Sequence, residues 1–187
     1  DKIVVHEIQQ NSKKFERRMS GSQSSMSMTL LERLAIPKMI LFKQLGIISP
    51  YKNERASSYL KSRMIDIRNW KYFAYDEKDD ELYIMNITPS DRVIGYQVRQ
   101  LNPKSNKQRY ISSRLTKIYS DVFSKDINGI VERLLLKEPL GKKYIEEEDG
   151  IENIVAHLDR LSGIFNIMNV NLSQPLTILE GPIDSLA

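Results

Sequence analysis

The last twelve residues, Leu176-Thr-Ile-Leu-Glu180-Gly-Pro-Ile-Asp184-Ser-Leu-Ala187, decide the fold that we expect for this chain. The apolar run 176–179 predicts a strand that is buried on both of its faces. Gly181 and Pro182 end that strand, and Pro182 suits the first position of a following helix. A buried strand that passes directly into a helix indicates the start of an α/β lobe.

Two carboxylates flank this turn, because Glu180 ends the strand and Asp184 falls in the first helical turn. Open α/β sheets bind ligands at the carboxyl ends of their strands, where two acids can hold a divalent metal ion such as Mg²⁺. An acid near a helix start is also favoured by the positive end of the helix, so spacing alone slightly favours a structural role. Glu180 fits that simpler explanation less well, because an acid that ends an apolar strand needs a cation or solvent.

Composition places the 187-residue chain, with 28% charged residues and no cysteine, among soluble globular proteins with a core. Disulfides and cysteine-based zinc sites are therefore excluded within this stretch. No apolar run has the length of a membrane span and no secretory signal is visible, so we expect a cytoplasmic protein without a membrane partner. Because the chain begins at Asp1 and stops where the new helix should begin, we expect a fragment of a larger protein.

Positive charge is concentrated in one segment, although the net charge of the whole chain is only +4. Residues 92–125 contain eight basic residues and one acidic residue, Asp121, which gives this segment a net charge of +7. Acids collect elsewhere, notably at residues 146–149. A cationic surface favours a polyanion such as a nucleic acid or nucleotide phosphates, whereas a solvated charged face is the commoner meaning of a charge run.

The pattern of apolar residues divides the chain into four regions and predicts an α+β fold. Residues 1–27 form a flexible linker or tail, and residues 28–125 form a basic lobe of helices followed by a small antiparallel sheet. Residues 126–170 form a helical segment, and residues 171–187 begin the α/β lobe.

Individual elements follow from caps, breakers and periodicity. Thr29 and Glu32 have the spacing of a capping box, Pro37 divides the first helical stretch in two, and Asn53 begins another helix. Strands are predicted at residues 81–87, 92–101 and 107–112, and we expect their sheet to have one packed face and one cationic face. Helices are predicted at residues 126–137 and 150–168, and the aromatic cluster at residues 70–75 is typical of a core.

Several of these motifs together resemble one family, the Toprim primases of bacteria and phages. Glu180-Gly-Pro-Ile-Asp184 resembles the first acidic motif of the Toprim fold. Four upstream runs resemble primase motifs and stand in the family's order: Ser58-Tyr-Leu-Lys-Ser-Arg-Met-Ile65, Asp91-Arg-Val-Ile-Gly-Tyr-Gln-Val-Arg99, Lys107-Gln-Arg-Tyr-Ile-Ser-Ser113 and Ile164-Phe-Asn-Ile-Met168. The resemblance covers residues 58–187 and extends weakly to the helices before them.

This resemblance implies a primase core, in which a basic lobe grips the template beside a Toprim lobe that holds the metal ions. The implied activity is DNA-templated synthesis of short RNA primers from ribonucleoside triphosphates on single-stranded DNA, with Mg²⁺ or Mn²⁺ as cofactor. A replicative helicase is the expected partner, and the bacterial cytoplasm, including that of a phage-infected cell, is the expected location. Zinc would belong only to an upstream module that is not in this stretch.

The resemblance also implies roles for particular residues. Glu180 and Asp184 would bind metal, and Glu180, Arg109 and Lys117 would be catalytic. Contacts to nucleic-acid or nucleotide phosphates are expected from Arg92, Arg99, Lys107, Arg109, Arg114 and Lys117. The chain departs from the family where Arg109 replaces a lysine, Ser112 an asparagine and Met64 a glycine, and residues 130–169 are longer than expected.

Three other functions remain open at the level of sequence. One is a different Toprim enzyme that acts on DNA, a topoisomerase or a nuclease, although no nucleophilic tyrosine is identifiable. Another is a non-catalytic scaffold of the replisome that binds nucleic acid. The third is an unrelated basic α+β domain, which four ordered partial matches make less favourable than a primase.

Overall fold

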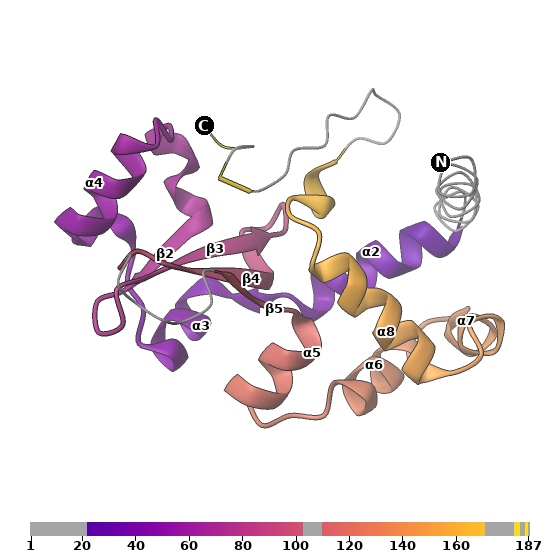
Figure 1. Ribbon diagram of the computed structural model, residues 1–187. Helices are drawn as coiled ribbons and strands as arrows, with labels where there is room; N and C mark the ends of the chain where they lie inside the picture. The colour runs from indigo at the N-terminus through magenta and orange to yellow at the C-terminus, as the bar shows by residue number, and fades with distance from the viewer. Residues whose placement is uncertain (1–21, 103–109, 171–181, 184–185, 187) are drawn as a thin grey trace, which may run out of the picture.

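Figure 1 shows a small antiparallel sheet with helices above and below it and a helical end at one side. This computed structural model describes residues 22–102, 110–170, 182–183 and 186 of the chain. The mixture of helices with a curled antiparallel sheet confirms the predicted α+β class.

Helical segments precede and follow a block of four consecutive strands along the chain. The helices are α2 (Ser22–Leu34), α3 (Lys38–Leu45), α4 (Glu54–Ser62), α5 (Leu115–Lys117), α6 (Ile127–Leu135), α7 (Gly141–Glu147) and α8 (Ile151–Ser162). The other helical turns are the 3-10 helices η1 (Pro50–Lys52), η2 (Ile67–Tyr72) and η4 (Ile167–Asn169), and the π-helical η3 (Ile118–Val122). The strands are β1 (Ile36–Pro37), β2 (Phe73–Asp76), β3 (Glu81–Ile87), β4 (Arg92–Gln100) and β5 (Tyr110–Ser113).

Strand β4 is the centre of the sheet, because it pairs with β3 along one edge and with both β1 and β5 along the other. All pairs are antiparallel, and β2 extends the sheet beyond β3. Successive side chains of a strand point to opposite faces, so the register assigns each residue to a face. The apolar face carries Ala74, Tyr83, Met85, Tyr96 and Val98. The mixed face carries Phe73, Leu82, Ile84, Asn86, Gln97, Arg99 and Ser112.

The apolar face is covered by one helix that precedes the main strands in the sequence and by one helical turn that follows them. Leu41 of α3 and Ile118 of η3 are fully buried against it, and Ile47 joins the same core. The phenol rings of Tyr83 and Tyr96 lie side by side in this core, with centroids 5.2 Å apart. Most of this face is therefore core, although Ile111, opposite Val98 on β5, is exposed.

Part of the mixed face is also packed, but by a different set of elements. Leu60 of α4 and Trp70 of η2 cover Phe73 and Ile84. The buried side chain of Ile183, from the end of the chain, belongs to the same core. In Figure 1 the end of the chain accordingly lies on the side of the sheet where α4 lies.

A third core joins α2 to the helical end of the molecule. Leu31, Val131 and Leu158 from α2, α6 and α8 are all fully buried in it. Asp126 begins α6 by accepting hydrogen bonds from the backbone N–H groups of residues 128 and 129. The predicted division of the chain at residue 126 stays a prediction, and residues on both sides of it share this core.

The structure corrects three local predictions. Thr29 does not cap a helix, because α2 already includes it and its hydroxyl donates to the carbonyl of Ser25 at 2.8 Å. The helix predicted at 150–168 ends at Ser162, where Gly163 follows as the C-cap. The strand predicted at 107–112 extends one residue further, to Ser113, and its predicted residues 107–109 lie outside the described residues.

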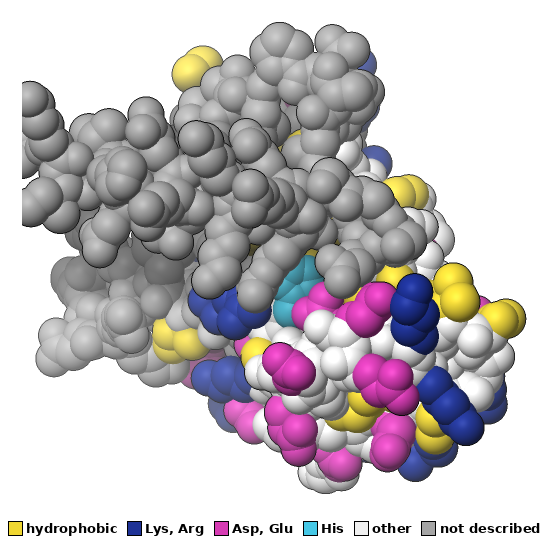
Figure 2. All heavy atoms as spheres, turned by 90° about the vertical axis from the view of Figure 1, so that its right-hand side faces the viewer, with side chains coloured by type: hydrophobic (Ala, Val, Ile, Leu, Met, Phe, Trp, Pro, Cys, Tyr) yellow, Lys and Arg dark blue, Asp and Glu magenta, His cyan; other side chains and the backbone are white. Residues whose placement is uncertain are grey.

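The described surface of the helical end carries charged side chains of both signs on the face that Figure 2 shows. Figure 2 shows this end, with acidic and basic side chains interspersed over the described surface. None of the described helices combines the length and the apolar composition that crossing a membrane requires.

Candidate nucleotide and nucleic-acid interface

The structure describes four of the predicted site residues, namely Arg92, Arg99, Arg114 and Lys117. The other predicted residues, Glu180, Asp184, Lys107 and Arg109, lie outside the described residues. The four described cations occupy different environments, and only two of them line or border the mixed face of the sheet.

Arg92 is tied to the backbone at the start of β4. Its Nε donates a hydrogen bond to the carbonyl oxygen of Ala35 at 2.8 Å, and the residue is half-buried. This bond joins the end of α2 to the central strand beside the β1–β4 pair. The guanidinium of Arg92 thus has a structural contact of its own, whether or not it also meets a phosphate.

Lys117 is exposed on α5 and lines an open hollow of about 780 Å³ between η3, α6 and α8. The lining includes two cations and four acids: Lys117, Lys125, Asp121, Asp126, Glu152 and Asp159. Asp126 caps α6, and Asp159 accepts from the backbone N–H and the hydroxyl of Thr116 at 2.9 and 2.6 Å. Because acids outnumber cations there, this hollow is poorly suited to a phosphate.

Arg114 lines a different pocket, of only about 10 Å³, which lies at the mixed face. Gln97 and Ser112 are directly opposite each other across β4 and β5, and Arg114 follows Ser112 by two residues. All three side chains line this pocket together with Phe165. The strand register therefore brings residues of two predicted primase motifs, 91–99 and 107–113, to one place.

The end of α8 forms the other wall of this pocket because Asn86 holds it against the sheet. Asn86 is only 4% exposed, and its Nδ2 donates to the carbonyls of Ser162 at 2.9 Å and Ile164 at 2.6 Å. Its Oδ1 accepts from the backbone N–H of Asn166 at 3.0 Å. One buried amide thus satisfies three backbone groups at the point where α8 ends.

Two glycines permit the close approach of α8 to the sheet. A Cβ atom on Gly95 would lie 2.5 Å from the carbonyl oxygen of Ser162, which no ordinary side chain tolerates. A Cβ atom on Gly163 would lie 3.0 Å from Nε of Arg114, so the arginine side chain rests on this glycine. The glycine of the motif at residues 91–99 is therefore a packing requirement of this fold.

Arg99 lies further along the mixed face, beside α4. Its guanidinium carbon is 5.6 Å from the centroid of the Tyr59 ring, a cation–π arrangement. The residue is half-buried and lies opposite Leu82 on β3. Arg99 and Arg114 therefore share a face of the sheet, and Lys117 lines a different hollow.

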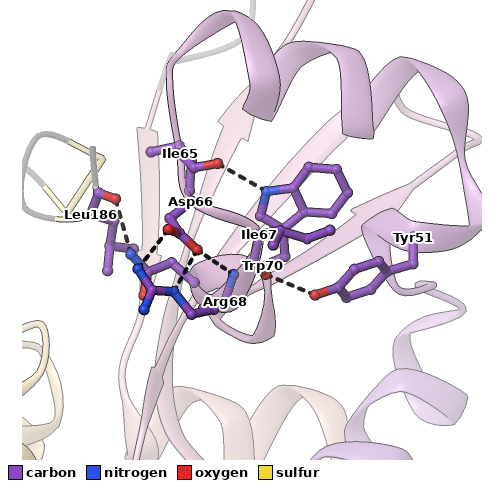
Figure 3. A network of polar contacts seen from close by, with 8 residues as sticks. Tyr51, Ile65, Asp66, Ile67, Arg68, Trp70 and Leu186 are labelled. Carbon is purple, nitrogen blue, oxygen red and sulfur yellow. Dashed lines mark hydrogen bonds and ion pairs between the residues drawn. The ribbon is translucent and has the colours of Figure 1, made fainter.

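Leu186, a described residue near Ile183 in the sequence, contacts η2, as Figure 3 shows. Asn69 donates its Nδ2 to the carbonyl oxygen of Leu186 at 3.1 Å. The indole of Trp70 donates to the carbonyl of Ile65 at 3.3 Å, and the hydroxyl of Tyr51 donates to the carbonyl of Ile67 at 2.8 Å. The bonds of Trp70 and Tyr51 fix the turns of η2 beside the residue that contacts Leu186.

Asp66 and Arg68 stabilise the start of η2. Arg68 donates to the two carboxylate oxygens of Asp66 from Nε at 3.0 Å and from Nη2 at 2.8 Å. These side-chain hydrogen bonds, followed by the one from the backbone N–H of Arg68, lower the pKa of Asp66 to about 2. Asp66 thereby caps η2 in its ionised form.

A cluster of acidic residues at the β2–β3 turn, separate from Glu180 and Asp184 in the sequence, was not predicted. Carboxylate oxygens of Asp76, Asp79 and Glu81 all lie within 4.8 Å of one another, an arrangement that could hold a metal ion. Asp76 Oδ1 also accepts from the backbone N–H groups of Lys78 and Asp79, and Glu81 accepts from the side chain of Gln100. The signal in the sequence was the run of five acids among residues 76–81.

The neighbouring Asp80 is engaged in an ion pair. Arg55 donates to its two carboxylate oxygens at 2.8 and 2.7 Å, and the hydroxyl of Tyr75 donates to it at 2.7 Å. Hydrogen bonding from Arg55 is the main reason why the pKa of Asp80 is lowered. Burial, and then the hydrogen bond to Asp80, raises the pKa of Tyr75 to about 12.

Comparison of the chain with family models, with curated protein sequences and with solved structures gave no match.

Proposed function

We propose that this chain is part of a DNA primase, a metal-dependent nucleotidyltransferase that copies single-stranded DNA into short RNA primers. The observation that carries the proposal is the position of Ile183. This residue lies between the two predicted metal ligands in the sequence, and it is 4% exposed in the core of the mixed face. The mixed face is also the one whose edge carries Gln97, Ser112 and Arg114.

Chain connectivity supports an active site on this face. Asp184 follows Ile183 directly, and Glu180 precedes it by three residues. Consecutive Cα atoms are 3.80 Å apart, so a residue three positions away has its Cα within about 11 Å. Phe165 packs against the core that contains Ile183 and also lines the pocket of Arg114. In this proposal the acids and the cations act on one nucleotide.

The proposed reaction is nucleotidyl transfer. The 3′ hydroxyl of the primer loses its proton to water and attacks the α-phosphorus of a ribonucleoside triphosphate. A new O3′–P bond forms, the bond from the α-phosphorus to the oxygen that bridges to the β-phosphate breaks, and pyrophosphate leaves. Mg²⁺ or Mn²⁺ would neutralise the charge that develops on the phosphate oxygens. Glu180 and Asp184 would hold the metal, while Arg99, Arg109 and Arg114 would bind phosphates.

Arginine at position 109 has a specific consequence for this reaction. A guanidinium stays protonated at all physiological pH values and can bind two phosphate oxygens at once. Arg109 would therefore orient the nucleotide but would not donate a proton to the leaving pyrophosphate. Lys117 remains part of the proposal as a catalytic residue, although the hollow beside it is rich in acids.

The test is template-dependent incorporation of ribonucleotides by the full-length protein with Mg²⁺ or Mn²⁺. Glu180→Gln should abolish primer synthesis and leave binding of single-stranded DNA intact, because it removes a metal ligand and no phosphate contact. Glu146→Gln, an exposed acid of α7, is the matched control and should keep full activity.

Two outcomes would contradict the proposal. Primer synthesis that survives Glu180→Gln would remove the assignment of Glu180 as a metal ligand. A wild-type protein that binds single-stranded DNA but makes no primer, with either metal and several templates, would instead favour the replisome scaffold.

A further inference from the structure

Three polar side chains at the edge of the mixed face have unused hydrogen-bonding capacity. Within residues 22–102, 110–170 and the few described beyond them, the side chains of Gln97, Ser112 and Arg114 make no hydrogen bond or ion pair. Most other polar side chains near them are engaged, as Asn86 and Ser162 are with backbone groups. Ser112 and Arg114 are exposed and Gln97 is half-buried, so their polar atoms face solvent and are open to a ligand. Convergent polar groups beside a pocket are a common feature of ligand sites.

The three side chains lie together because the sheet places them together. Gln97 and Ser112 form a cross-strand pair, and Arg114 extends the same face by two residues. They line a single small pocket whose far wall is Gly163 and Phe165 at the end of α8. Asn86 fixes that wall to β3, so the pocket is built by the fold and does not depend on flexible side chains alone.

The pocket itself, of about 10 Å³, is too small to enclose a phosphate, so an anion would bind over its mouth, where Ser112 and Arg114 are exposed. The chemistry of this mouth selects an anion with several oxygens. A guanidinium, a hydroxyl and an amide NH₂ are all hydrogen-bond donors, and arginine binds phosphate oxygens bidentately. No acid lines this pocket, in contrast to the hollow beside Lys117. We propose that Gln97, Ser112 and Arg114 form a phosphate-binding subsite, and that Gly163 is the positioning residue that seats Arg114.

The role of Gly163 follows from its missing side chain. The side chain of Arg114 lies over this glycine, and a Cβ atom at position 163 would lie 3.0 Å from Nε of Arg114. An alanine would shift the guanidinium by a few tenths of an ångström without changing any charge. In this way the helical segment before Gly163 would take part in binding, although its own surface is of mixed charge (Figure 2).

The proposed function enters this inference only in naming the source of the phosphate, which is either the template backbone or the nucleoside triphosphate. The experiment therefore measures binding and not synthesis. The full-length protein is titrated with a fluorescein-labelled single-stranded 16-mer by anisotropy, and with ATP by calorimetry, at several salt concentrations. The variants are Arg114→Gln, Arg114→Lys and Gly163→Ala. The control is Lys142→Gln, which removes one positive charge from an exposed position on α7, as Arg114→Gln does at the proposed site.

Arg114→Gln should weaken one of the two ligands about tenfold, because it removes a hydrogen-bonded charge. If the ligand is the template, the slope of log K against log salt should fall by about 0.7, the value for one single-strand phosphate contact. Arg114→Lys and Gly163→Ala should each give an intermediate loss, and Lys142→Gln should give none. Weakening of the 16-mer alone assigns the template backbone, and weakening of ATP alone assigns the incoming nucleotide.

Two results would overturn the inference. One is unchanged binding of both ligands by Arg114→Gln in a protein whose thermal unfolding is also unchanged. The other is an equal loss in Lys142→Gln, which would indicate net charge and not a site. Neither result depends on Glu180, so failure of the subsite and failure of the proposed polymerase activity are distinguished by separate variants.

Discussion

The two faces of the same sheet serve different purposes, although they are made by alternate residues of the same strands. The apolar face buries Tyr83, Met85 and Val98 beneath α3 and η3. The mixed face is packed only in part, and its edge leaves Gln97 and Ser112 beside Arg114 without partners among the described residues. One strand can therefore supply a core on one side and a binding surface on the other, because its side chains alternate.

The difference between the faces arises from how the helices meet them. Helices α3 and η3 cover the apolar face with large buried side chains. On the mixed face α8 arrives end-on at Gly95 and is held by Asn86 through backbone groups. A helix that approaches by its end covers little of the sheet, so polar side chains beside it keep their access to solvent and ligand.

Truncation on the apolar face should cause the largest loss of stability. Leu41→Ala removes a fully buried side chain and should lower the free energy of unfolding by about 3 kcal/mol, a typical cost for this change. Gln97→Ala, at the edge of the mixed face, should change it by less than about 0.5 kcal/mol. Denaturant unfolding of the two variants compares the faces directly, and equal losses would contradict the division between them.

Gly95→Ala should be the next most damaging change, because it breaks the contact that joins the two regions. The new Cβ atom would lie 2.5 Å from the carbonyl oxygen of Ser162, and overpacking of this kind costs about 2 kcal/mol. In Gly129→Ala the Cβ atom would meet only the side chains of Asp126 and Arg133, so this helical control should change little. If Gly95→Ala unfolds like wild type, α8 does not approach β4 as described.

Ile183→Ala tests whether the end of the chain rests on the mixed face. Loss of its buried side chain should lower the free energy of unfolding by about 2 kcal/mol, the lower end of the range for isoleucine. Asn69→Ala, which removes the hydrogen bond to Leu186, should cost about 1 kcal/mol. If neither substitution changes the free energy of unfolding, Ile183 and Leu186 do not pack against the mixed face and η2 in solution.

Acid should weaken the β2–β3 turn, and this is the smallest effect that we expect. The pKa of Asp80 is lowered in the folded protein, chiefly by hydrogen bonds from Arg55. A depressed pKa means that the stabilisation is complete above the unfolded value of about 3.9 and is lost as the pH falls below it. The pair is partly exposed, so its loss should cost less than about 1 kcal/mol.

The measurement is unfolding of wild type and Asp80→Asn between pH 7 and pH 2. The variant should be less stable at neutral pH, and the difference should shrink on acidification. The variant keeps Asp66, whose pKa is lowered to about 2 by Arg68, so part of the acid sensitivity should remain. A difference that grows at low pH would contradict the assigned ion pair.

Elements with strong local signals were predictable from the sequence. Pro37 separates α2 from α3, Asn53 caps α4 by accepting from the N–H of Ala56, and Asp126 caps α6. The start of α2 was mispredicted because Thr29 bonds back into its own helix and so imitates a cap. Strand β2 was missed because it follows η2 within one aromatic run that shows no period of two.

The site was only partly predictable, because pockets depend on contacts between distant residues. The pairing of Gln97 with Ser112 follows from strand register, which the two motifs suggested but did not specify. The wall made by Gly163 depends on Asn86, more than seventy residues earlier, and no local pattern encodes that contact. The predicted strand 176–179 and its two acids stay predictions, because they lie outside the described residues.

The central claim is that a divalent metal ion binds beside Ile183 on the mixed face, and Mn²⁺ tests it through its paramagnetism. In the methyl-labelled full-length protein, Mn²⁺ should broaden the resonances of Ile183 and leave Val131 of the helical core sharp. Glu180→Gln should abolish that broadening, and Asp79→Asn, in the acidic β2–β3 turn, should preserve it. Broadening of Ile183 that survives Glu180→Gln but disappears in Asp79→Asn would contradict the account.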